Sequence, residues 1–215
     1  MITQAEFEKK CAEFEIKEER AKFYEMARNQ SMLGFKAEAC VILMGTWNFA
    51  AWRYGVKEFD KNKYDQLMHS LEPIFIELSS ERFEAADYVK LEEKINKIYA
   101  PLSKIKGIEY TGATKLMLIE NPNLFMPWDQ YIREYYSFRK DGKSYSLFMK
   151  KMQEEYGSLK APKGKTLPKA IDEYNYVTIS LPAMNSKKER KIKFNERKKE
   201  EIKQFKEWKK KIYKG

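Results

Sequence analysis

Apolar residues recur at helical spacing through the first half of the chain. Residues 4–28 predict one amphipathic helix, because their apolar positions are separated by three, four and seven residues: Phe7, Cys11, Phe14 and Ala21. Residues 35–53 are far more apolar and predict a second helix, central to the core. Residues 60–71 predict a third helix, which we expect to end at Glu72-Pro73 because proline cannot continue the hydrogen-bonded backbone.

The middle of the chain continues in the same pattern. Asp87 is a favourable N-cap and predicts a helix that runs to Tyr99. Pro101 then begins a region that we expect to form a hairpin. Further on, Ser144 is predicted to cap a helix that ends near Tyr156.

The last third of the chain alternates helical and broken segments. Residues 157–168, GSLKAPKGKTLP, predict an exposed loop or linker. Residues 169–176 predict a short helix, and residues 176–179 are β-branched enough to leave helix and strand both open. Residues 182–186 are predicted to break the chain again. A thin apolar stripe then marks a terminal helix that we expect to dock on the body: Ile202, Phe205, Trp208 and Ile212. The predicted fold class is all-α, a helical bundle with little or no strand.

The amino-acid composition excludes several kinds of functional site. With 43% hydrophobic residues, the 215-residue chain can bury a substantial core. His69 is its only histidine, and Cys11 and Cys40 are its only cysteines, too few for a histidine metal cage or a disulfide framework. We expect no metal and no cofactor. No secretory signal is apparent, and the longest uncharged apolar run, residues 39–52, is shorter than the roughly 20 residues of a membrane span. We therefore expect a cytoplasmic protein, monomeric and without a membrane partner.

The net charge of +10 lies mostly at the C-terminus. Residues 187–215 hold fourteen Lys/Arg and five Asp/Glu, so this segment carries nearly all of the excess. We divide the chain into a helical domain, residues 1–186, and a basic tail, residues 187–215. A basic tail suits an anionic partner such as nucleic acid, whereas the simpler interpretation is a solvated lysine-rich helix.

The segment with the most specific pattern is residues 102–133, LSKIKGIEYTGATKLMLIENPNLFMPWDQYIR. It predicts a short helix, a tight turn at Gly107, a second helix, an Asn-Pro-Asn turn, and a third helix that begins after Asp129. A glycine turn can bring backbone N–H groups close to a phosphate. A carboxylate at a helix N-terminus is favoured in its charged form.

These residues resemble the helix-hairpin-helix DNA glycosylases. The similarity lies at Gly107, Ile108 and Ala113 of the hairpin, and at Asp129, which follows Gly107 by the 22 positions that separate the hairpin glycine from the family's catalytic aspartate. The resemblance covers about residues 30–136. It implies an all-α, glycosylase-like bundle whose partner is duplex DNA, with one base turned out of the stack.

The resemblance also implies roles for individual residues. Asp129 would be the catalytic carboxylate, which stabilises positive charge on the sugar or activates water. The hairpin would contact DNA through residues on and around it: Lys104, Lys106, Gly107, Ile108, Thr111 and Lys115. The base pocket, or the wedge that fills the gap in the duplex, would include Trp47, Asn48 and Trp128.

Two positions depart from the family pattern. Bifunctional members carry a Schiff-base lysine where this chain has Thr111, so the resemblance implies a monofunctional enzyme unless Lys104, Lys106 or Lys115 substitutes. Glu109 stands where the family has its second hairpin glycine, and its carboxylate would lie close to a bound phosphate.

Three hypotheses follow. The first is a monofunctional DNA glycosylase for DNA repair, a hydrolase that cleaves the N-glycosidic bond of a damaged or mismatched base. The second is a non-catalytic helix-hairpin-helix protein that binds DNA or RNA through the hairpin and the tail. The third is a helical domain that binds another protein. For Asp129 the simpler interpretation is an ordinary N-cap, and for Asn48 a buried structural residue.

Overall fold

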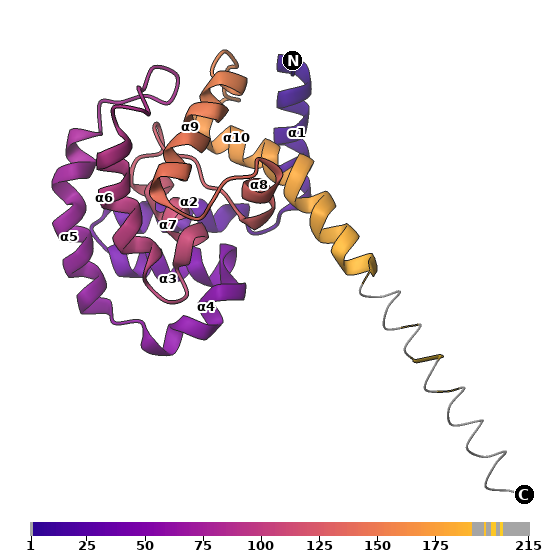
Figure 1. Cartoon of the computed structure of the whole chain (residues 1–215), viewed down its shortest axis with the longest axis horizontal. Coiled ribbons are helices and arrows are strands. Elements are labelled where there is room, and N and C mark those ends of the chain that lie inside the picture. Colours follow the sequence, from indigo (N-terminus) through magenta and orange to yellow (C-terminus); the bar gives the residue numbers. More distant parts are fainter. Residues whose placement is uncertain (1, 191–195, 197–198, 201–202, 204–215) are drawn as a thin grey trace, which may run out of the picture.

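The computed structural model describes residues 2–190, together with Glu196, Lys199, Glu200 and Lys203. Every regular element in this part of the chain is helical, which confirms the all-α fold class (Figure 1). The predicted stripe of the terminal helix, Ile202, Phe205, Trp208 and Ile212, lies outside the described residues.

The first half of the chain forms α1 (Gln4–Lys17), α2 (Ala21–Met32), α3 (Lys36–Trp47), α4 (Phe49–Gly55), the 3-10 turn η1 (Val56–Glu58) and α5 (Lys61–Glu77). Residues 4–28 and residues 35–53 were each predicted as a single helix, and the structure divides both. The first is divided after Lys17 and the second at Asn48. The predicted end at Glu72-Pro73 was wrong. Pro73 lies inside α5, where burial of Leu71 and Phe75 on the same helix offsets the missing hydrogen bond.

The second half forms α6 (Glu92–Ser103), α7 (Glu109–Glu120), α8 (Gln130–Tyr135), α9 (Gly142–Tyr156), α10 (Leu167–Asn175) and the π-helical segment η2 (Tyr176–Ser180). Asp87 caps a turn before α6, and α6 continues through Pro101. The N-cap of α9 is Asp141, whose carboxylate accepts the Ser144 N–H at 2.7 Å. The prediction that Ser144 caps this helix was therefore wrong. Residues 182–186 are helical rather than a break.

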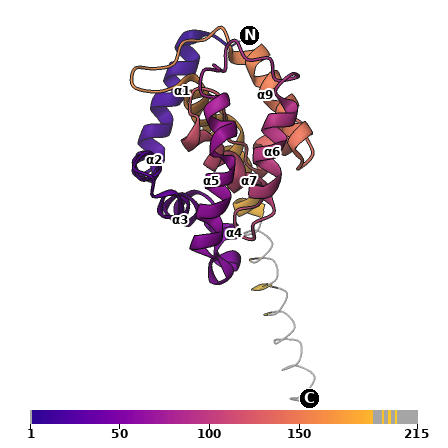
Figure 2. The ribbon, with the colours of Figure 1, turned by 90° about the vertical axis from the view of Figure 1, so that its left-hand side faces the viewer.

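The helices pack as a bundle around the buried α7 (Figure 2). Helix α6 lies beside both α7 and α9, and α2 packs on α3 and α7. Seven of the twelve residues of α7 are buried, which explains why its sequence, EYTGATKLMLIE, has no clear polar face. This central helix also carries Thr111 and Lys115.

The loop between α7 and α8 is held rigidly in the core. Tyr88 donates a hydrogen bond to the Leu124 carbonyl at 2.9 Å, and Tyr145 donates to the Met126 carbonyl at 2.8 Å. Trp128 is fully buried, and its backbone N–H donates to Thr114 Oγ1 at 3.3 Å. These bonds satisfy loop carbonyls that burial removes from water. They fix the position of the next residue, Asp129.

The hairpin between α6 and α7 packs closely against α4. Gly107 has a φ of +88°, and a Cβ added there would lie 3.1 Å from the Gly55 Cα and 3.3 Å from the Trp52 Cα. The turn predicted at Gly107 is therefore present, with the glycine buried against a helix. Glu109 also has a positive φ, +53°, so the position that the family gives to glycine keeps a glycine-like conformation here.

We expect Gly107→Ala to destabilise the protein more than Gly34→Ala does. Both glycines have a φ near +90°, so both alanines cost about 1 kcal/mol of backbone strain. A Cβ at Gly34 meets nothing within 4 Å, whereas one at Gly107 meets the backbone of α4. The measurement is the free energy of unfolding in urea. Equal destabilisation of the two variants would contradict the close packing of the hairpin on α4.

Candidate functional site

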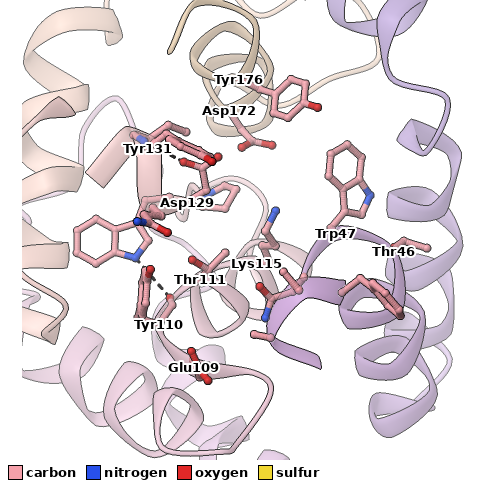
Figure 3. A pocket seen from close by; sticks show the side chains of 18 of the residues that line it. Thr46, Trp47, Glu109, Tyr110, Thr111, Lys115, Asp129, Tyr131, Asp172 and Tyr176 are labelled. Atoms are coloured by element: carbon pink, nitrogen blue, oxygen red, sulfur yellow. Dashed lines mark hydrogen bonds between the residues drawn. The ribbon is translucent and has the colours of Figure 1, made fainter. Parts of the chain in front are cut away.

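A cavity of about 570 Å³ opens between the α3–α4 junction, the start of α7, the start of α8, and the end of α10 with η2 (Figure 3). We call it the Asp129 pocket. It brings together residues far apart in sequence, including Trp47, Lys115, Asp129 and Asp172. Its walls combine aromatic side chains, among them Trp47 and Tyr176, with ionisable ones such as Lys115, Asp129 and Asp172.

Asp129 is the N-cap of α8 and also lines the pocket. Its Oδ1 accepts the Ile132 N–H at 2.8 Å, which leaves Oδ2 without a hydrogen bond from the described residues. Figure 3 shows the side chain at the pocket wall, above Thr111 and beside Lys115. The interpretation of Asp129 as a cap is therefore confirmed. The cap holds the carboxylate in a fixed orientation at the edge of a cavity.

Trp47 forms one wall of the pocket. Its indole stacks on Phe14, with ring centroids 5.9 Å apart and an interplanar angle of 15°, and it meets Tyr176 edge-on at 6.2 Å. The guanidinium of Arg20 lies 4.8 Å from the indole centroid. Cations at this distance are attracted to the ring face. The wall is consequently a rigid aromatic surface with positive charge around it.

Lys115 and Lys169 approach this same indole but differ in their partners. The Lys169 Nζ lies 3.1 Å from Asp172 Oδ2 and 3.4 Å from Glu173 Oε1. Although burial lowers the pKa of Lys169, these two carboxylates raise it above its ordinary value. The protonated Lys169 thereby fixes the side chain of Asp172 at the edge of the pocket.

Lys115 has no such partner. Its Nζ lies 5.2 Å from the Trp47 centroid, and no hydrogen bond or ion pair to it is found among the described residues. Burial lowers its pKa below the ordinary value, a shift that the negative charges of Asp172 and Asp129 oppose without cancelling. Sequence reasoning placed Lys115 among DNA contacts, whereas its ammonium points into the pocket (Figure 3).

The structure separates the other predicted site residues into two groups. Thr111, Trp47, Asn48 and Trp128 line the pocket with Asp129. Four hairpin residues do not: Lys104, Lys106, Gly107 and Ile108. Lys104 and Lys106 are exposed, and Lys106 forms an ion pair with Glu58. The Ile108 N–H donates to the Ile105 carbonyl at 3.1 Å, so it is already used within the hairpin.

Asn48 connects the pocket wall to the hairpin. Its Nδ2 donates to the carbonyls of Gly107 and Ile108, at 2.9 and 3.0 Å. The side chain is therefore a structural bridge, as the simpler interpretation held, and its amide is not free to enter a duplex. The neighbouring Phe49 also lines the pocket, and its side chain is 57% accessible.

Sequence reasoning missed several residues of the site, among them Asp172 and Tyr176. Asp172 and Tyr176 come from α10 and η2, far from the hairpin in sequence, and no motif marks them. The Tyr176 hydroxyl donates to Glu18 Oε2 at 2.8 Å, and Glu18 binds Arg20 at 2.6 Å. Burial and this bond to Glu18 raise the pKa of Tyr176 to about 12. The tyrosine is accordingly neutral and fixed at neutral pH.

The part of the chain that the structure describes contains no group of three His, Cys, Asp or Glu side chains placed to hold a metal ion. Within the same residues, no helix combines the length and apolar character needed to cross a bilayer. The chemistry that the Asp129 pocket can offer with its own side chains is that of three carboxylates, one amine, one guanidinium and an aromatic wall. Such a set can stabilise a cation, move a proton or attack a carbonyl group.

Comparison with known proteins found no matching family model, and neither curated proteins nor solved structures gave a significant match. The resemblance to helix-hairpin-helix glycosylases accordingly depends on the hairpin residues and Asp129 alone.

We expect Asn48→Asp to destabilise the protein by about 2 kcal/mol, because it removes two donors and places a carboxylate against two carbonyls. Asn62→Asp is the matched control. Asn62 is exposed in the first turn of α5, where an added negative charge is tolerated or favourable. Thermal unfolding of both variants measures the difference. A melting temperature for Asn48→Asp equal to that of Asn62→Asp would contradict the bridge.

Proposed function

We propose that the protein is a DNA glycosylase-like hydrolase that cleaves the N-glycosidic bond of a damaged or mismatched base, with Asp129 as the carboxylate. The observation that carries the proposal is the position of Asp129. A carboxylate oriented by capping α8, with its second oxygen unbonded among the described residues, faces a cavity with an aromatic wall. Volumes of roughly 300–1,000 Å³ are typical of small-molecule pockets, so about 570 Å³ can accommodate a flipped nucleotide.

Cleavage of the N-glycosidic bond needs a negative charge close to the sugar, and Asp129 would supply it. As the base leaves, positive charge develops on the sugar, and a fixed carboxylate nearby stabilises it or accepts a proton from the attacking water. Asp129 needs no rearrangement for this because the Ile132 N–H already orients it. Trp47 supplies a flat surface on which a base can stack.

DNA would approach across α4, which lines the pocket, and across the hairpin that packs against α4. Phe49 is exposed there, next to Asn48, and apolar side chains at such positions can insert where a base has left the stack. Lys104 and Lys106 would contact phosphates from the hairpin. This arrangement moves the proposed wedge from Asn48 to Phe49.

We expect Asp129→Asn to lower the rate of base release by about 100- to 10,000-fold. Asparagine caps helices as well as aspartate does, so α8 remains capped and the fold is retained. Asp141→Asn is the matched control, since Asp141 caps α9 in the same way and does not line the pocket. Base release would be followed by chromatography on duplexes that each carry one lesion or mismatch.

Two results would contradict the enzyme hypothesis. One is equal base release by the Asp129→Asn variant and the wild type. The other is binding to duplex DNA with no base released from any member of a broad lesion panel.

A second candidate function is nucleic-acid binding without chemistry, favoured by the net positive charge of residues 187–215. Replacing the lysines and arginines of this segment by glutamine keeps its length and should weaken DNA binding. The plot of log Kobs against log salt concentration should become shallower by roughly 0.9 for each phosphate that the tail no longer neutralises. Binding would be measured by fluorescence anisotropy at several salt concentrations. An unchanged slope would exclude the tail from the DNA interface.

A further inference from the structure

A second cavity, of about 330 Å³, lies between α2 and the loop that precedes α10. It shares no lining residue with the Asp129 pocket. Basic side chains line it from α2, from the loop and from the start of α10: Lys22, Arg28, Lys163, Lys165 and Lys169. Three glutamates line it as well: Glu15, Glu25 and Glu173. We call it the Lys163 cavity.

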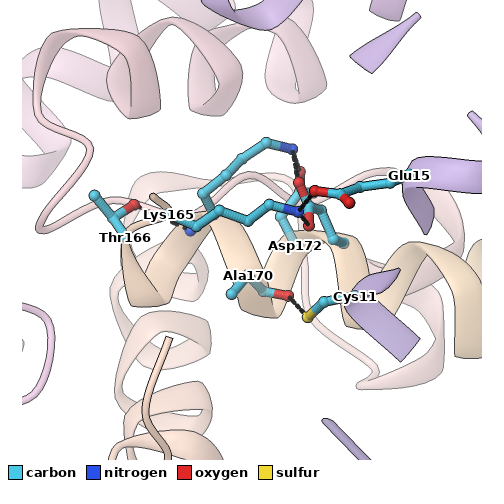
Figure 4. Close-up of polar contacts among 8 residues, drawn as sticks. Cys11, Glu15, Lys165, Thr166, Ala170 and Asp172 are labelled. Atoms are coloured by element: carbon cyan, nitrogen blue, oxygen red, sulfur yellow. Dashed lines mark hydrogen bonds and ion pairs between the residues drawn. The ribbon is translucent and has the colours of Figure 1, made fainter. Parts of the chain in front are cut away.

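The two least exposed lysines of this cavity are neutralised by carboxylates. The Lys165 Nζ lies 2.8 Å from Glu15 Oε1 (Figure 4), and it also pairs with Glu173. The Lys169 Nζ lies 3.4 Å from Glu173 Oε1. Buried charges need such partners, because an unpaired charge is costly to remove from water. These two lysines therefore support the cavity wall, and two of the three glutamates are used in doing so.

The other three cations of the cavity have no close acidic partner. No hydrogen bond or ion pair to the ammonium of Lys22 or Lys163 is found among the described residues. Arg28 lies 3.9 Å from Glu25, which is beyond hydrogen-bond distance. Its side chain is nevertheless only 37% exposed. A half-buried guanidinium, whose planar fork of N–H donors matches the oxygens of a phosphate, is thus left with its donors unused within the described chain.

The backbone beside these cations adds to the positive potential. Gly164 has a φ of +84°, which allows the loop to turn between Lys163 and Lys165. Thr166 then caps α10 and lines the cavity, so the partial positive charge of the helix N-terminus lies at the same place. Cations from α2 and from this loop, far apart in sequence, consequently face one space.

We propose that the Lys163 cavity binds a phosphate-bearing anion through Arg28, Lys22 and Lys163. A phosphate group carries about two negative charges near neutral pH and several strong acceptor oxygens. Arginine can bind two of those oxygens at once, and each lysine contributes a point charge. At about 330 Å³ the cavity is at the lower end of the roughly 300–1,000 Å³ typical of small-molecule pockets, so a diphosphate fits its size and charge. Binding here depends on neither Asp129 nor base release.

The test is a titration of the ¹⁵N-labelled full-length protein with pyrophosphate, followed in amide NMR spectra at constant ionic strength. We expect a saturable shift of the Gly164 amide, which lies between two lysines of the loop. Arg28→Gln and Lys163→Gln should each raise the Kd by about tenfold, because each removes a charge-assisted contact to phosphate. Lys150→Gln is the matched control. It removes one positive charge from an exposed position of α9 that does not line the cavity, and should leave the Kd unchanged.

Thermal unfolding establishes that each variant is folded. Lys163→Gln lies in an exposed position of a loop and provides the result if Arg28→Gln fails to fold. The proposal would be overturned if pyrophosphate gave no saturable shift at Gly164, if the shifts were confined to residues 187–215, or if Lys163→Gln bound pyrophosphate as tightly as wild type.

A second titration, with a short DNA duplex in place of pyrophosphate, identifies the source of the phosphate. A Gly164 shift that saturates with duplex and weakens in Lys163→Gln would assign the bound phosphate to a nucleic-acid backbone. Saturation by pyrophosphate without a Gly164 shift on duplex would assign it to a small phosphate-bearing molecule. Base release, which tests Asp129, is measured separately, so failure of one proposal leaves the other standing.

Discussion

The side chain of Asn48 connects the two halves of the candidate site. It interrupts an apolar stretch between α3 and α4, and its amide donates to two carbonyls of the hairpin that precedes α7. Trp47 lies immediately before it and Lys115 lies two turns into α7, so this bridge sets the distance between the aromatic wall and the amine. The close packing of Gly107 on Trp52 and Gly55 reinforces it. A polar residue inside an apolar run is stable here because both of its donor hydrogens are satisfied.

The carboxylates are positioned by different means. Asp129 is held by the cap of α8 and by the pinned loop before it, in which buried tyrosines bind backbone carbonyls. Asp172 is held by its ion pair with Lys169, within a cluster of charges that also includes Lys165, Glu15 and Glu173. Figure 4 shows Asp172, Lys165 and Glu15 of this cluster. The two acids therefore reach the pocket from two different helices, α10 and α8, and the charges of both act on Lys115.

Lys115 and Lys169 lie near the same indole but differ in their partners, since only Lys169 forms ion pairs among the described residues. This difference distinguishes the pocket from an ordinary polar cleft. A buried ion pair such as Lys169–Asp172 is expected wherever a charge must be removed from water. Lys115 instead has no hydrogen bond or ion pair among the described residues, and its ammonium lies over the Trp47 indole. Its presence beside Asp129 favours an interpretation of the pocket as a reactive site.

The sequence by itself determined the helical class, the turn at Gly107 and the helix after Asp129, because each depends on local periodicity, backbone freedom or capping. It misplaced features that depend on packing, such as the continuation of α5 through Pro73 and the division of the helices at residues 18 and 48. Only the tertiary structure decided that Asn48 is a bridge, that Lys115 faces a cavity, and that Asp172 from α10 lies beside it. Those facts depend on interactions between residues about 40 to 160 positions apart, which no local pattern encodes.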